Sequence, residues 1–223
     1  MHQRKSKKIL LYFFLLIVFS SISNYSLNDL KLNQIKNINI SGLEQKDKKI
    51  LFDKLKTLSK ENIFLINKNE IVKLINSNFL VEKYEVFKKY PSTIYVNVQK
   101  TNFLAKINKK GKIFFIGSNG KLIPVKNHDN NLPYIFGKPD INEFLKFKEI
   151  IDKSKFSYDS IDNLYFFPSN RWDIKLKEDI LLKLPQNYTH LNLDIMYEFL
   201  KNNRDKSLAI VDHRIGNQII LNE

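Results

Sequence analysis

The chain of 223 residues has no cysteine, a single tryptophan, and only six glycines and six prolines. Without cysteine, neither a disulfide nor a thiolate metal site can hold or operate the fold. The glycines fit turn positions, and the sequence contains no glycine-rich phosphate loop, nucleophile elbow or HExxH helix. The familiar motifs of nucleotide-dependent enzymes and hydrolases are therefore absent.

Metal-binding and acid–base patterns are missing as well. No histidine has a partner three or four residues away that would make a metal pair. The four histidines are scattered: His2, His128, His190 and His213. Asp159 and Asp162 could act as an acid and a base, but their loop-like surroundings are typical of turn and cap residues. We therefore expect no catalytic residue, no metal site and no cofactor.

Acidic residues are scarce relative to basic ones. The chain has 37 Lys and Arg against 23 Asp and Glu, for a formal net charge of +14. A clustered excess would suggest binding to nucleic acid or to an anionic surface. The lysines are instead spread through every expected element, which is typical of solvated surfaces, and no aromatic and basic motif of a nucleic-acid reader is present. We expect no nucleic-acid partner.

The sequence has one long apolar run, Ile9 to Phe19, and the uncharged span continues to Leu27. Its length is roughly that needed to cross a hydrocarbon core of about 30 Å. Arg4, Lys5, Lys7 and Lys8 precede it, a bias that keeps the N-terminus in the cytoplasm. We expect residues 1–8 to be a cytoplasmic tail and residues 9–27 a single transmembrane anchor in the inner membrane. Residues 28–34 then form a linker.

A cleaved signal peptide is the alternative for the same stretch. The basic start, the apolar region and the small residues Ser21 and Ser23 around Ile22 satisfy that pattern too. A buried soluble helix fits less well, because no polar face interrupts the run at helical spacing. Both leading interpretations export the remainder of the chain.

Residues 35–100 follow the order β-α-α-β-β. A strand around Ile40 precedes a helix over about 46–58, and a second helix begins after the pair Asn67 and Glu70, which is typical of a cap. Two runs, 81–88 and 93–100, alternate apolar and polar residues around a turn and predict a hairpin with one buried face. This order predicts two helices packed on one face of a three-stranded sheet.

Residues 101–223 are richer in strands, with two packed helices, so the fold class is α+β. Strands are predicted over 103–108, 113–116, 122–125 and 161–167, and a hairpin over 170–185. A helix from about Asp140 to Ser154 should bury Phe144, Phe147 and Ile151. A helix over about 191–201 should have Leu191, Ile195 and Phe199 on its inner face. Trp172 is interpreted as core packing and Arg171 as a surface charge.

These segments, taken in order, resemble a POTRA domain followed by the β domain of the FtsQ/DivIB family of bacterial cell-division proteins. The first half matches at 38–42, 64–67, 79–86 and 90–98, and the second at 132–137, 171–185 and 211–214. Five features depart from the family pattern. Gln99-Lys100 replaces an acidic-basic pair, the 117–120 turn lacks the usual Asp, and residues 177–179 replace an Asn-Gly or similar turn. His213 and Ile215 replace Leu and an aromatic residue.

The resemblance implies a non-enzymatic scaffold of the division machinery that links early and late division proteins. It implies a POTRA domain over 35–100 and an FtsQ-type β domain over 101–223, both periplasmic. The partners it implies are upstream division proteins at the POTRA domain, and FtsB and FtsL at the β domain. Alternatives are a POTRA-containing component of outer-membrane protein transport or assembly, and an exported hydrolase with an unrecognised site.

The C-terminal segment is the candidate partner-binding surface. Residues 208–215 and 218–221 are predicted to form a hairpin, and Gly216-Asn217 suits its turn. The last strand carries neither charge nor proline to blunt its outer edge. A partner strand could add to this edge; the alternative is that the edge is short and harmless. The expected partner-binding residues are Asp212, Arg214, Ile215, Gly216, Asn217, Gln218, Ile219 and Ile220.

Overall fold

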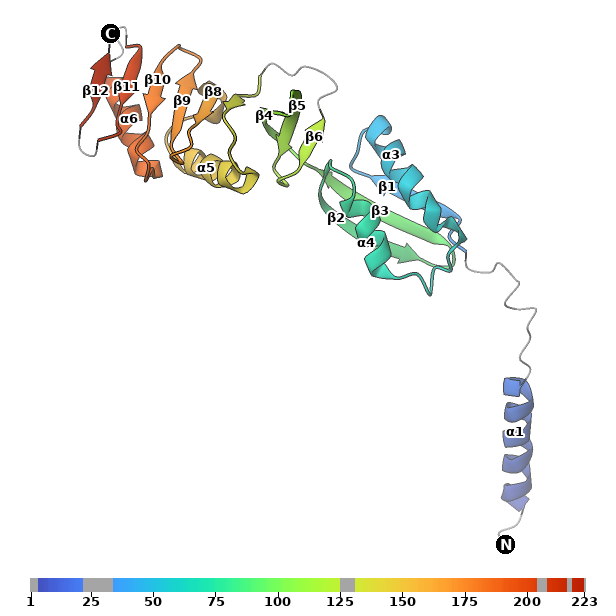
Figure 1. Ribbon diagram of the computed structural model, residues 1–223. Helices are drawn as coiled ribbons and strands as arrows, with labels where there is room; N and C mark the ends of the chain where they lie inside the picture. The colour runs from blue at the N-terminus through green and yellow to red at the C-terminus, as the bar shows by residue number, and fades with distance from the viewer. Residues whose placement is uncertain (1–3, 22–33, 125–130, 204–207, 216–217, 223) are drawn as a thin grey trace.

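The computed structural model (Figure 1) describes residues 4–21, 34–124, 131–203, 208–215 and 218–222. It comprises an N-terminal helix, α1 (Arg4–Ser21), and two units that each enclose a hydrophobic core. The side chains from Ile9 to Phe19 are exposed on α1. Within the described ranges, no helix has both the length and the apolar character needed to cross a bilayer. The expected anchor at 9–27 extends beyond the described part of the chain.

The first unit is a three-stranded sheet with two helices, which confirms the predicted β-α-α-β-β order. Its strands lie in the order β1-β3-β2, with β1 parallel and β2 antiparallel to β3. In chain order the elements are β1 (Asn37–Ser41), α3 (Gln45–Leu55), the 3-10 helix η1 (Lys56–Lys60), α4 (Lys68–Asn76), β2 (Val81–Lys89) and β3 (Thr93–Lys100).

The core of this unit follows from two periodicities of the sequence, the alternation of its strands and the helical spacing of its apolar residues. Alternation on β3 places Ile94, Val96 and Val98 on the face covered by the helices, as predicted. Leu51 and Leu55 reach them from α3, and the last turn tightens into η1. At α4 the cap is the Asn67 side chain, which accepts a hydrogen bond from the N–H of Asn69.

The second unit is a mixed nine-stranded sheet in the order β12-β11-β10-β9-β8-β7-β4-β5-β6. Its strands are β4 (Phe103–Lys109), β5 (Lys112–Gly117), β6 (Leu122–Pro124), β7 (Tyr134–Phe136), β8 (Ile161–Phe166), β9 (Trp172–Leu176), β10 (Leu181–Lys183), β11 (Ile210–Asp212) and β12 (Ile220–Asn222). Strand β7, which the sequence patterns do not predict, joins β4 to β8 through parallel pairings. The short helix η2 (Tyr158–Ser160) precedes β8.

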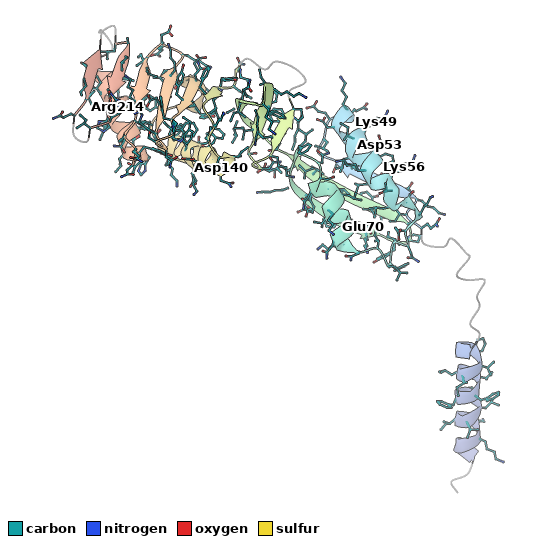
Figure 2. The ribbon with its side chains drawn as sticks, viewed as in Figure 1. Lys49, Asp53, Lys56, Glu70, Asp140 and Arg214 are labelled. Atoms are coloured by element: carbon teal, nitrogen blue, oxygen red, sulfur yellow. The ribbon has the colours of Figure 1, made fainter. Side chains whose placement is uncertain are left out.

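Two helices, α5 (Ile141–Lys153) and α6 (His190–Asn202), cover one face of the sheet (Figure 1). Trp172 is fully buried there, as predicted, and its ring stacks on Phe147 with centroids 4.5 Å apart. Phe144 and Phe166 also pack on the indole, and such aromatic pairs add about 0.5–1.5 kcal/mol beyond area burial. Asp140 caps α5 by accepting from the N–H of Asn142; Figure 2 labels it.

The predicted buried face of α6 is wrong at Leu191 and Ile195, although Phe199 does pack against the core. Leu191 and Ile195 are 60% and 50% exposed, whereas Leu193 and Met196 are fully buried. Both sets satisfy helical spacing, so the sequence pattern does not distinguish them. The capping box of Thr189 and Asn192 defines where the helix begins, and contact with the sheet sets which face is buried.

The loop over 117–121 connects the two units. The Asn119 side chain donates from Nδ2 to the carbonyls of Phe79 and Val81, both at 2.9 Å. Lys121 Nζ donates to the carbonyls of Asn76 and Asn78 at the end of α4, and Ser118 Oγ donates to Glu82 at 2.7 Å. Gly117 allows this close approach, because a Cβ there would lie 2.6 Å from Asn119 Oδ1 and 2.8 Å from Thr101 Oγ1.

Replacing leucines on α6 tests the orientation of this helix. Leu193→Ala should lower the free energy of unfolding by about 2–5 kcal/mol, because it leaves a cavity in the core. Leu191→Ala, the matched control on the same helix, should change it by less than about 0.5 kcal/mol. Urea unfolding of both variants measures the difference, and equal losses would contradict the observed orientation.

Candidate partner-binding edge of the nine-stranded sheet

Strand β12 forms one edge of the nine-stranded sheet. It pairs antiparallel with β11, with Asp212 opposite Ile220 and Val211 opposite Leu221. In the described part of the chain, no other strand pairs with β12. Ile220 is 49% exposed and Leu221 is 37% exposed. The edge therefore offers a short row of backbone donors and acceptors flanked by accessible apolar side chains.

The structure brings the described members of the predicted site together around this edge. Asp212 is buried on β11, and Ile215 is 56% exposed beyond it. Gln218 precedes β12, and the Ile219 side chain packs against the core. Gly216 and Asn217, the predicted turn, lie outside the described residues. The hairpin pairing is confirmed, although both strands are shorter than expected.

Asp212 and Arg214 form a bidentate ion pair. Arg214 Nε lies 2.9 Å from each carboxylate oxygen and Nη2 lies 2.6 Å from Oδ2, while the Arg214 N–H donates to Oδ1 at 3.0 Å. Burial alone would raise the pKa of Asp212, but the hydrogen bonds and charge of Arg214 outweigh it and hold this pKa below its ordinary value. The Arg214 side chain remains 45% exposed.

A second acid lies close to this pair in the sheet. Asp173 on β9 is opposite Lys183 on β10, and Lys183 is opposite Asp212 on β11. Asp173 is only 3% exposed. Burial raises its pKa above the ordinary value, although the charge and hydrogen bond of Arg171 act in the opposite direction. The two carboxylates on either side of Lys183 thus have pKa values shifted in opposite directions.

Arg171 is more than the surface charge inferred from the sequence. Its Nε donates to Asp173 at 3.2 Å, and its guanidinium lies 4.2 Å from the centre of the Phe167 ring. Its side chain is 23% exposed. The alternation on β9 could have indicated that Asp173 faces away from Trp172, but only the sheet register brings Arg171 and Asp173 near Asp212.

His213 closes the loop that leads to the edge strand. It is 3% exposed, and its backbone N–H donates to the Lys183 carbonyl at 3.0 Å. Its Nδ1 lies 3.0 Å from the carbonyl oxygen of Gln218, which can only accept, so Nδ1 carries the proton. The His213 departure from the family pattern is thereby explained as a contact that positions the start of β12.

The sheet face opposite α5 and α6 continues from this charged row into aromatic side chains. Phe136 pairs with Tyr165 across β7 and β8, and Tyr165 pairs with Asp173. The Phe136 and Tyr165 rings stack with centroids 5.0 Å apart, and Phe136 is 44% exposed. Among the described residues, no group of three His, Asp or Glu side chains could hold a metal ion. This surface offers charged side chains, aromatic faces and the backbone groups of the strand edge.

The opposite pKa shifts predict opposite pH dependences for two matched variants. Asp212→Asn should destabilise the fold near neutral pH, and its deficit should shrink as the pH falls below about 4. The reason is that a depressed pKa stabilises the fold above the unfolded-state pKa, and this contribution is lost through the folded-state pKa. Asp173→Asn should become more favourable as the pH rises, because a raised pKa weakens the fold in that direction. Urea unfolding across pH measures both, and parallel profiles would refute the assignment.

Comparisons with known proteins agree with this architecture. Residues 33–100 match the FtsQ-type POTRA domain. The chain is 24% identical over 163 residues to cell division protein FtsQ of Rickettsia bellii, a match that covers 68% of this chain and 57% of that protein. It is 29% identical over 155 residues to cell division protein DivIB of Clostridium botulinum, covering 66% and 59%. The chain thus spans about three fifths of the length of these relatives.

A solved structure of the major extracytoplasmic domain of DivIB from Geobacillus stearothermophilus, in its trans isomer, is also similar. It has 11% sequence identity and a TM-score of 0.34, over 47% of this chain and 98% of that one. The POTRA match covers the first unit, and the FtsQ and DivIB matches are too long to end there. Residues 33–100 are therefore an FtsQ-type POTRA domain, and the chain as a whole is similar to the FtsQ and DivIB cell-division proteins.

Proposed function

We propose that this protein is a non-enzymatic scaffold of the division machinery, held in the inner membrane by residues 9–27 with its N-terminus in the cytoplasm. Residues 35–100 are the POTRA domain, which meets upstream division proteins in the periplasm. Residues 101–223 are the β domain, which binds FtsB and FtsL. The FtsQ-type POTRA domain and the similarity to the cell-division proteins FtsQ and DivIB support this proposal, together with the absence of catalytic motifs from the sequence.

The observation that carries the proposal is the free edge of β12. Backbone groups along an unpaired edge can bind an extended peptide, while neighbouring side chains provide specificity. Ile220 lies on the same sheet face as Asp212, because the two are opposite each other in the register. An added strand would therefore lie next to an apolar side chain and a charged pair.

Arg214 is the charged group that a partner would meet. Its Nε and Nη2 are directed at Asp212, which fixes the plane of the guanidinium. The exposed part of this planar group is suited to a carboxylate of the partner. The ion pair with Asp212 lowers the entropy that Arg214 loses when it binds.

A lysine at the edge tests this site. Ile220→Lys should weaken binding of the periplasmic segment of FtsB at least about tenfold, because an ammonium group is poorly accommodated in an apolar contact. Ile195→Lys on α6 is the matched control: Ile195 is 50% exposed and Ile220 49%, so the control tests the same change on another surface. Binding is measured by calorimetry with the purified protein.

The two affinities decide the location of the interface. Loss of binding in Ile220→Lys with full binding in Ile195→Lys supports the β12 edge. Unchanged binding in Ile220→Lys places the interface elsewhere. Circular dichroism of both variants verifies that the fold is retained.

The attachment to the membrane has its own test. Protein isolated from cell membranes should retain the residues before Asn24, because the small residues here are serines and do not form an Ala-x-Ala cleavage site. The double variant Ser21→Ala and Ser23→Ala creates such a site and should be shortened. Mass spectrometry of the intact chains measures both, and a native chain that starts near Asn24 would exclude the anchor.

A further inference from the structure

Three large side chains are exposed together at one end of the POTRA domain: Phe64, Leu65 and Tyr90, which we name the apolar tip. Leu65 is 82% exposed, Phe64 55% and Tyr90 54%. The Phe64 and Tyr90 rings stack, with centroids 4.6 Å apart and planes 12° from parallel. Scattered exposed apolar residues are ordinary, but a contiguous cluster marks an interaction surface.

The backbone holds these side chains outward. The N–H groups of Leu65 and Ile66 both donate to the carbonyl of Asn62, and the Asn62 side chain accepts from the N–H of Phe64. On either side of the tip, Ile63 and Ile66 are buried in the core, at 0% and 6% exposure. The turn is therefore fixed at both ends, and Phe64 and Leu65 cannot turn inward without breaking it.

The apolar tip adjoins the place where the chain arrives from α1. Gln34 forms a bridge with Asn62, and the N–H of Ile35 donates to the Glu61 carbonyl. The N–H of Lys36 donates to the Ser92 carbonyl, beside the turn that carries Tyr90. Residues 22–33 separate α1 from this point, and a chain of that length can reach no more than about 45 Å.

The charge around the apolar tip suits an anionic surface. Four lysines lie on the segments that form it and are exposed: Lys36, Lys60, Lys68 and Lys89. The exposed acids on these segments are Glu61 and Glu70, the latter labelled in Figure 2. Lysines near an anionic bilayer are attracted to its surface, and tyrosine is enriched at the depth of the lipid headgroups.

We propose that the apolar tip rests in the headgroup region of the bilayer in which residues 9–27 are anchored, with Phe64 and Leu65 inserted and the lysines on anionic phospholipids. The inference rests on the membrane anchor of the proposed function. A short tether brings the tip to the surface, and the contact then fixes the orientation of the POTRA domain. The β12 edge, in the other unit, is left free for protein partners.

The absence of cysteine makes a site-specific test possible. Leu65→Cys, labelled with a polarity-sensitive fluorophore, reports on the tip in the full chain. Leu191→Cys, at an exposed leucine of the second unit, is the matched control. Both are reconstituted in vesicles of phosphatidylethanolamine with a minority of phosphatidylglycerol, with or without lipid that carries a nitroxide on its headgroup.

We expect the label at 65 to be quenched several-fold more strongly than the label at 191. Replacing Phe64 and Tyr90 with Ser in the Leu65→Cys chain should reduce this quenching, because the insertion loses its apolar neighbours. Flotation of the vesicles tests the anchor separately. If the chain floats with the vesicles and both labels are quenched equally, the membrane contact of the apolar tip is wrong but the anchor is supported. If the chain does not float, both the contact and the anchor are wrong.

A protein partner at the tip gives a different result. In that case the label at 65 is not quenched in vesicles that contain no other protein, and it becomes shielded only when division proteins are added. This outcome also overturns the proposal, because it assigns the apolar tip to a protein surface instead of a lipid surface.

Discussion

The hydrogen bonds of the 117–121 loop determine where the second sheet lies relative to the POTRA domain. A helix leaves its last carbonyls without donors of its own, and the carbonyls at the end of α4 and the start of β2 accept hydrogen bonds from donors outside these elements. Asn119 and Lys121 supply them, and the Lys121 ammonium is also favoured at the C-terminus of a helix. A hydrogen bond of this type contributes about 1 kcal/mol, so the loop acts by fixing geometry as much as by adding stability.

Elements whose signals are local could be predicted from the sequence. The POTRA order, the buried faces of β3 and β9 and the inward side of α5 follow from periodicity and from caps such as Asp140. The face of α6 could not be predicted, because Leu191 with Ile195 and Leu193 with Met196 fit the same period, and contact with the sheet decides between them. The Asn119 turn is visible in the sequence, but its contacts with Phe79 and Val81, 40 and 38 residues away, depend on how the units meet.

The candidate site shows the same division between local and distant information. Arg214 and Asp212 are two residues apart, so their pairing could be inferred from the sequence once β11 was placed. The pairing of β10 with β11 is parallel, and α6 lies between these strands in the sequence. The proximity of Asp173 and Lys183 to Asp212 therefore follows from the sheet topology alone. Exposed ion pairs such as that of Lys153 with Glu149 are worth about 0–1 kcal/mol. The charges near β11 differ from these because two of the carboxylates are buried.

The continuous order of nine strands has a geometric consequence for the two edges of the sheet. Neighbouring strands rotate by about 20–25° in a constant sense, so the eight steps from β6 to β12 accumulate to about half a turn. The edge strand β6 is close in sequence to the loop that binds the POTRA domain, whereas β12 is at the far end of this rotation. A peptide that added to β12 would continue the rotation by one more step. The direction of the added peptide would therefore be set by the twist of the sheet and not by a flexible joint between domains.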